Sequence, residues 1–130
     1  MDANIVIAAL LRDSSTRYLI AVGGHELHAP RLLVEEIEEH WMEISDRSGI
    51  PGESLREIFQ VLRVFIIEHE VADYRKRLEE ASTILAGGDV EDAPYVALLL
   101  AMAADGIWTQ DRRLLELPAV KTFRTSDLLR

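Results

Sequence analysis

Apolar residues recur along the 130-residue chain in two kinds of segment. Short apolar runs bounded by turn residues predict β-strands at 26–29, 64–67, 106–109 and 120–123. Segments with helical spacing predict helices at 14–22, 30–47, 53–62, 72–86 and 93–104, with shorter helical turns at 111–117 and 126–129. Because strands and helices alternate throughout, the pattern predicts an α/β domain around a parallel sheet.

Two of the expected helices differ in how they should be buried. In the segment 30–47, an apolar stripe at helical spacing predicts one long helix with a single buried face, formed by Leu33, Ile37, Trp41 and Ile44. The segment 93–104 is apolar almost all round, which predicts a helix that is covered on both sides. It is shorter than the roughly 18–20 residues that span a bilayer, so we expect a core helix.

The composition is that of a soluble globular protein, with 48 % hydrophobic and 28 % charged residues, and the length predicts one domain over 1–130. The chain contains no cysteine, which excludes disulfides and thiolate metal sites. A basic start followed by a long apolar run, the mark of a signal peptide, is absent. We therefore expect a cytoplasmic protein that makes no membrane contact.

The net charge of −9 argues against a general nucleic-acid-binding surface, which is normally basic. A nucleic-acid substrate would need a metal ion at the cleft and a local basic group, such as Arg12, Arg17 or the pair Arg112 and Arg113. The excess of acid is also compatible with a surface that faces a basic partner protein.

Four short acidic stretches, at 1–4, 35–36, 89–94 and 108–111, each border an apolar segment that we expect to be buried. If the fold brings two carboxylates to ~4 Å, they repel by roughly 4 kcal/mol at an effective dielectric of ~20. Such a cluster needs protons or a cation, and Mg²⁺ or Mn²⁺ prefers oxygen ligands of this kind. The stretches therefore indicate metal-assisted chemistry on a phosphate.

Asp92 and Glu36 are candidates on local geometry. Asp92 precedes Pro94, which is tolerated in the first turn of a helix, so Asp92 should lie at the N-terminus of the helix that follows. A helix-capping role explains Asp92, and equally its neighbours Asp89 and Glu91. Glu36 lies at the edge of the apolar stripe of its helix, where a carboxylate can face a cleft, and a solvated charge is the alternative.

The candidates Asp111 and Asp2 depend on the sheet. Asp111 follows the expected strand 106–109, and ligands gather at the carboxyl ends of parallel strands, although an ordinary turn aspartate is the alternative. Thr109 either orients a bound water or phosphate or is a plain strand residue. Only Met1 precedes Asp2, so either the first strand is nearly absent or the chain starts upstream. Residues this close to a terminus are expected to be disordered by default.

In this order and spacing, the four stretches resemble the motifs of the PIN-domain family, which includes the toxin ribonucleases of prokaryotic toxin–antitoxin pairs. The segment 2–4 (Asp-Ala-Asn) resembles the opening Asp-x-Asn motif, and 30–37 is similar to the segment that supplies a glutamate. The segments 92–97 and 108–111 are similar to the third and fourth motifs, each with its own aspartate. Since 120–129 resembles the closing strand and turn, the resemblance covers nearly the whole chain.

The resemblance implies a three-layer α/β/α sandwich with a parallel central sheet, whose first strand is short or truncated here. It also implies an acidic pocket that holds one or two Mg²⁺ or Mn²⁺ ions and hydrolyses RNA phosphodiester bonds. The metal-binding and catalytic residues would be Asp2, Glu36, Asp92 and Asp111. Three further residues would position these carboxylates from behind or from the rim: Asn4, Thr109 and Glu91.

The sequence leaves two main classes of function open. The first is a metal-dependent endoribonuclease, the toxin of a pair held inactive by a small antitoxin protein. The second is an inactive PIN-like module that keeps the acidic pocket but works through protein contacts. A metal-dependent phosphatase is disfavoured because its Asp-x-Asp opening reads Asp-Ala-Asn here. Trp41 and Met42 look exposed, so the two helices between 30 and 62 are a candidate homodimer surface.

Overall fold

The strands of the computed structural model, which describes residues 1–11, 13–86, 88 and 90–129, form two parallel two-stranded sheets. In the first sheet β1 (Leu27–Pro30) pairs with β2 (Ile66–His69). In the second, β3 (Ile107–Trp108) pairs with β4 (Thr122–Phe123). The four expected strands are therefore present and parallel, which confirms the α/β class.

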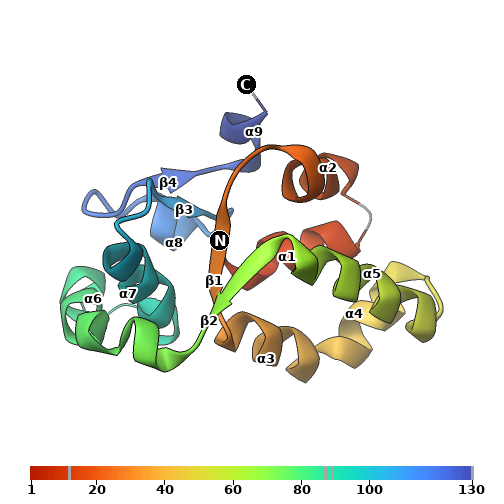
Figure 1. Cartoon of the computed structure of the whole chain (residues 1–130), viewed down its shortest axis with the longest axis horizontal. Coiled ribbons are helices and arrows are strands. Elements are labelled where there is room, and N and C mark those ends of the chain that lie inside the picture. Colours follow the sequence, from red (N-terminus) through yellow and green to blue (C-terminus); the bar gives the residue numbers. More distant parts are fainter. Residues whose placement is uncertain (12, 87, 89, 130) are drawn as a thin grey trace.

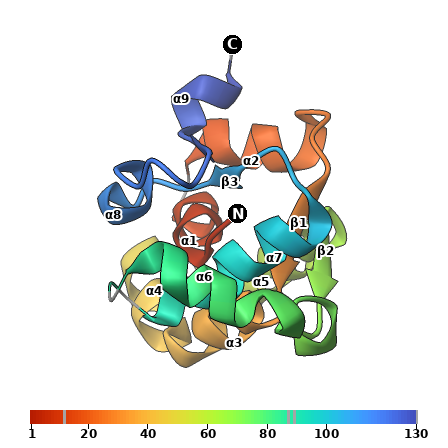
Figure 2. The ribbon, with the colours of Figure 1, turned by 90° about the vertical axis from the view of Figure 1, so that its left-hand side faces the viewer.

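Met1 and Asp2 lie between the two sheets and connect them. The amino group of Met1 donates a hydrogen bond to the carbonyl of His28 in β1, at 3.2 Å, and the amide of Asp2 donates to the carbonyl of Trp108 in β3, at 3.1 Å. Figures 1 and 2 show the N-terminus in the middle of the molecule, between β1 and β3. Met1 and Asp2 thus lie where a central strand would run between β1 and β3.

Helices cover both faces of the strands (Figure 1). On one side lie α1 (Ala3–Leu10), α2 (Ser14–Val22), α3 (Leu32–Glu39), α4 (Trp41–Ser48) and α5 (Gly52–Val64). On the other side lie α6 (Leu78–Leu85) and α7 (Ala93–Met102), and the short α8 (Arg112–Leu115) and α9 (Thr125–Leu128) flank β3 and β4. This arrangement is the expected three-layer α/β/α architecture.

Helix α7 contributes to two hydrophobic cores. Tyr95 packs into the core formed mainly by α1 to α5, whereas Val96, Ala97 and Leu98 belong to the core between α6, α7 and β3. All four side chains are buried, which confirms that this apolar helix is covered on more than one side. No helix among the described residues is both long and apolar enough to cross a membrane.

The expected single helix over 30–47 is wrong, because the chain changes direction at His40. His40 has φ −102° and ψ 15°, so α3 ends there and α4 begins at Trp41. The turn lets the Trp41 ring pack on Phe59 at a centroid distance of 5.8 Å, while the Arg56 guanidinium stacks 3.8 Å from the Trp41 ring centre. Trp41 is therefore half-buried inside the protein and, unlike exposed Met42, does not mark a free surface.

The expected helix over 72–86 also begins later than predicted. Residues 71–77 form two 3₁₀ turns, η1 (Val71–Asp73) and η2 (Arg75–Arg77), and α6 starts only at Leu78. Three consecutive basic residues at 75–77 are unfavourable at the positive end of a helix dipole, whereas Glu79 and Glu80 suit the first turn of α6. A third 3₁₀ turn, η3 (Val90–Asp92), leads into α7.

The packing of α5 gives a first prediction. Phe59 is fully buried, so Phe59→Ala should leave a cavity and lower the free energy of unfolding by about 3–5 kcal/mol. Val61 lies on the exposed side of the same helix, and Val61→Ala should change it by no more than about 0.5 kcal/mol. Urea denaturation followed by circular dichroism measures both values, and equal effects would contradict the placement of α5.

Candidate active site

Asp2 is buried at the start of α1, so the expectation of a disordered N-terminus is wrong. Its side chain is only 7 % exposed and caps α1 by accepting a hydrogen bond from the amide of Asn4, at 3.1 Å. Its second carboxylate oxygen accepts a hydrogen bond from the hydroxyl of Thr109. The side chain of Asn4 is exposed, and it is the backbone of this residue that contacts Asp2.

Thr109 brings Asp2 and Asp111 together. It follows β3, is fully buried, and uses one hydroxyl group for two contacts. The hydroxyl donates to Asp2, and its oxygen accepts the amide hydrogen of Asp111 at 2.9 Å. Asp2 and Thr109, 107 positions apart in the chain, thereby meet, and Thr109 contacts both aspartates.

Asp111 combines features of an ordinary turn aspartate and of a ligand-binding acid at the end of a strand, the two alternatives that the sequence allowed. It caps α8 by accepting the amide hydrogen of Arg113 at 2.9 Å, as a turn aspartate would. It is also half-buried and lies directly beside Thr109 at the carboxyl end of β3. Its second oxygen lies 3.6 Å from the Arg113 guanidinium.

Glu36 and Asp92 approach the same region from α3 and α7. Glu36 is half-buried and accepts a hydrogen bond from the hydroxyl of Tyr95, at 3.1 Å, which joins the two helices. Asp92 lies at the N-terminus of α7, as predicted, but its side chain makes no capping hydrogen bond to that helix. Its position at the positive end of the α7 dipole is the one that the capping alternative predicted.

The electrostatics show that these carboxylates share one region. Burial raises the pKa of Glu36 above its ordinary value of 4.5, and the negative charges of Glu91, Asp2 and Asp92 raise it further. The hydrogen bond from Tyr95 acts in the opposite direction. Burial likewise raises the pKa of Asp2, against the hydrogen bond from Thr109 that lowers it. The fold therefore holds several acids together at a cost that its hydroxyl groups only partly offset.

Tyr95 contacts a candidate acid, Glu36, but the motif analysis did not single it out. Burial raises the pKa of its phenol, and the neighbouring Glu36 carboxylate raises it further, so the hydroxyl stays protonated and remains a donor. A signal was present in the sequence, because Tyr95 follows Asp92 by three residues in a helix and therefore lies on the same face.

The donor set suits a hard cation, since every candidate ligand is a carboxylate oxygen. Among the described residues no three His, Asp or Glu side chains already converge into a metal centre, and Asp89 lies outside these residues. This geometry is compatible with Mg²⁺, which usually keeps several waters and takes one or two carboxylates directly. Besides burial, the negative charges of Glu91, Asp2 and Asp92 raise the pKa of Glu36, and an ion bound here would offset these charges.

The basic groups that the sequence offered have separate positions. Arg12 lies outside the described residues, and Arg17 donates to the carbonyl of Ala9 between α1 and α2. Beside Asp111, a cavity of about 430 Å³ is lined by Gln110, Arg112, Leu115, Glu116 and Arg124. Of the basic groups that the structure describes, the pair 112–113 lies next to the candidate acid Asp111, whereas Arg17 lies between α1 and α2, and Arg124 lines the same cavity as Arg112.

The comparisons with known proteins agree with this geometry. A family model described as "PIN domain" matches residues 1–128. The chain therefore belongs to the PIN-domain family. It is similar to the VapC ribonuclease Mb0985 of Mycobacterium bovis and to ribonuclease VapC9 of Mycobacterium tuberculosis. Each is 32 % identical over 115 residues, which cover 88 % of this chain and 86 % of the relative. No solved structure matches the chain.

The raised pKa of Glu36 makes stability depend on pH. The folded protein holds the Glu36 proton more tightly than the unfolded chain, so this residue lowers the free energy of unfolding as pH rises from about 4.5 through its raised pKa. Glu36→Gln should remove this loss and become more stable than wild type near pH 7.5. Urea denaturation from pH 4 to 7.5 should show the difference growing with pH, and a constant difference would contradict the pKa shift.

The hydroxyl of Thr109 should matter more than its shape. Thr109→Val keeps the volume of the side chain but removes the hydroxyl that donates to the buried Asp2 carboxylate. This loss should lower the free energy of unfolding by about 1–3 kcal/mol. Thr109→Ser retains the hydroxyl and serves as the matched control. Thermal and urea denaturation at pH 7.5 would show the effect, and a serine variant as unstable as the valine variant would assign it to packing.

Proposed function

We propose that this protein is an endoribonuclease that hydrolyses RNA phosphodiester bonds with Mg²⁺ or Mn²⁺, acting as the toxin of a cytoplasmic toxin–antitoxin pair. The observation that carries the proposal is that acids from four distant segments lie in one region of the fold. Asp2 is joined to Asp111 through Thr109, and Glu36 is close enough to Asp2 and Asp92 for their charges to raise its pKa. Membership of the PIN-domain family and similarity to VapC ribonucleases support it.

The proposed ligands are Asp2, Glu36, Asp92 and Asp111, bound to the ion directly or through water. A bound divalent ion supplies Lewis-acid stabilisation of phosphate charge and makes a coordinated water more acidic. The hydroxyls of Thr109 and Tyr95 hold the Asp2 and Glu36 carboxylates in one orientation, so less rearrangement is needed when substrate arrives. Glu91, exposed at the rim, adds negative charge at the pocket.

The net charge of −9 would repel RNA, and the basic residues beside Asp111 provide local positive charge against this repulsion. Between residues 107 and 124 the chain has four Lys or Arg and two Asp or Glu, the reverse of its overall balance. Arg112 and Arg124 line the open cavity beside Asp111. We assign to them the contact with the RNA backbone on the side of Asp111, because guanidinium groups bind phosphate well.

An antitoxin protein is the proposed partner, and the excess acidic charge favours a partner with basic groups. The alternative function, an inactive PIN-like protein-binding module, has one observation in its favour. The acids of the described residues do not form a complete metal centre without rearrangement. Cleavage of RNA distinguishes the two functions.

Cleavage of an RNA pool in Mn²⁺ is the direct test. Wild type should cleave it, chelation with EDTA should abolish cleavage, and Asp92→Asn should lower the rate by about 10- to 100-fold or more because a proposed ligand is lost. Sequencing the RNA ends would show whether cuts are internal.

Glu39→Gln is the matched control, because Glu39 is exposed on the same helix as Glu36 and should keep full activity. If wild type leaves the RNA intact with Mn²⁺ and with Mg²⁺ while binding a partner protein, the module is the better description. Activity that survives both EDTA and Asp92→Asn would mean a different site or mechanism.

A further inference from the structure

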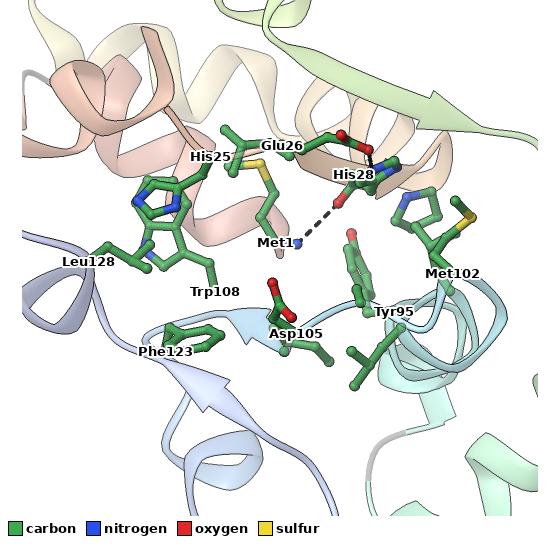
Figure 3. A pocket seen from close by; sticks show the side chains of 17 residues that line it. Met1, His25, Glu26, His28, Tyr95, Met102, Asp105, Trp108, Phe123 and Leu128 are labelled. Carbon is green, nitrogen blue, oxygen red and sulfur yellow. Dashed lines mark hydrogen bonds and ion pairs between the residues drawn. The ribbon is translucent and has the colours of Figure 1, made fainter. Parts of the chain in front are cut away.

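Outside the acidic site, two histidines and two carboxylates form one continuous row of contacts. His28 of β1 and His69 of β2 meet through their rings, with 2.8 Å between Nδ1 of His28 and Nε2 of His69. At the outer ends, Nε2 of His28 lies 2.6 Å from the Glu26 carboxylate, and Nδ1 of His69 lies 2.9 Å from that of Asp73. Figure 3 shows Glu26 beside the His28 ring. All four ring nitrogens are therefore in contact with a polar atom.

This row of contacts connects three elements at the point where α3 starts. His28 lies in β1, His69 ends β2, and Asp73 lies in η1. His69 is buried, and its carbonyl accepts the amide hydrogen of Arg31 at 2.8 Å, one residue before α3 begins. A change in the cluster would therefore act on the end of β1 from which the helix that carries Glu36 starts.

A count of protons shows what the cluster needs. Glu26 and Asp73 are exposed to water, where carboxylates are ionised at neutral pH and only accept hydrogen bonds. The outer ring nitrogens of His28 and His69 are therefore donors, and a neutral imidazole has one N–H. Both central nitrogens would then be bare, at a separation of 2.8 Å that is typical of a hydrogen bond. Three hydrogen bonds thus need a third proton between the two rings.

A metal ion is the other cation that two facing ring nitrogens can bind. Zn–N bonds are ~2.0–2.1 Å long, so an ion between nitrogens this close would lie to one side, with both rings bent toward it. The ring centres are 5.0 Å apart, which exceeds the nitrogen separation of 2.8 Å by about the width of an imidazole ring. The nitrogens therefore point almost straight at each other, as in an N–H···N hydrogen bond, and a proton fits this geometry better than a metal ion does.

The ion pairs that the structure describes for the two histidines are those with Glu26 and Asp73. The Met1 amino group donates to the backbone carbonyl of His28 and not to its ring. Further charged or titratable groups on the elements around the cluster are Arg31 paired with Glu70, Arg63 with Glu68, Tyr95 with Glu36, Glu35 near Tyr74, and Asp105 in the cavity beside His28. The added proton therefore lies between two carboxylates that contact the rings directly.

We propose that Glu26, His28, His69 and Asp73 form a proton-dependent clamp between β1, β2 and η1, in which the two imidazoles share one added proton. With this proton, all three contacts are hydrogen bonds. When the proton is lost as pH rises, only two of the three contacts can be hydrogen bonds. When a second proton is gained as pH falls, two N–H groups face each other at the centre. The clamp concerns the fold and holds whether or not the protein cleaves RNA.

Nitrogen-15 NMR of the full chain, in the presence of EDTA, tests the shared proton directly. Protonated and bare ring nitrogens differ in chemical shift, and a scalar coupling across an N–H···N bond identifies its two nitrogens. At about pH 6.5, where histidine ordinarily titrates, both outer nitrogens should be protonated and one proton should couple to both central nitrogens. His28→Gln and His69→Gln assign the signals. Two bare central nitrogens at this pH, or no coupling between the rings, would overturn the proposal.

Glu26→Gln should remove the need for the third proton. The glutamine amide can donate to Nε2 of His28, so His28 donates to His69 and His69 donates to Asp73, with both rings neutral. Folded wild type keeps a proton that the unfolded chain releases, so its stability falls as pH rises above about 6.5. The folding equilibrium constant of Glu26→Gln relative to wild type should therefore rise roughly fivefold between about pH 6.5 and 8.5, the effect of one hydrogen bond.

Asp73→Asn acts at the other end of the clamp by the same exchange of an acceptor for a donor, and it should give the same rise. Glu43→Gln is the matched control, because Glu43 pairs with a single exposed histidine, His40, at 4.0 Å. Its folding constant relative to wild type should stay the same at both pH values. Urea denaturation measures all three variants. A ratio for Glu26→Gln that does not change with pH, or an equal rise in the control, would show that the clamp holds no added proton.

Discussion

The rest of the structure depends on two backbone hydrogen bonds, from Met1 to His28 and from Asp2 to Trp108. These bonds join the first two residues to β1 in one sheet and to β3 in the other, and they fix where α1 begins. Because Asp2 is the residue that turns from sheet to helix, its carboxylate lies at the positive end of the α1 dipole. The same contacts therefore link the two sheets and place the first acid of the site.

The acidic site conflicts with the stability of the fold that builds it. Burial raises the pKa of both Asp2 and Glu36, and repulsion from Glu91, Asp2 and Asp92 raises that of Glu36 further, so the ionised forms destabilise the folded state. Thr109 and Tyr95 reduce this cost by donating hydrogen bonds, and both are themselves buried in the core. A fold selected for stability alone would place apolar residues at these positions, so the conflict itself points to function.

The sequence predicted what depends on local patterns and missed what depends on tertiary contacts. The four strands and the apolar α7 follow from periodicity, and the motifs located Asp2, Glu36, Asp92 and Asp111 as candidates. The break at His40 was not visible, because the apolar stripe continues across it when α3 and α4 cover the same core. Nor could local patterns reveal the bonds from Thr109 to Asp2 and from Tyr95 to Glu36, whose partners are far apart in the chain.

The 107-residue separation of Asp2 and Thr109 has a consequence for protein synthesis. On the ribosome Asp2 emerges first, whereas Thr109 and β4, the strand that pairs with its neighbours, are among the last parts to leave. The pocket cannot form on a partial chain, since its first acid has no hydroxyl partner until β3 is free to fold. The contact between Asp2 and Thr109 is therefore completed only when nearly the whole chain has been made.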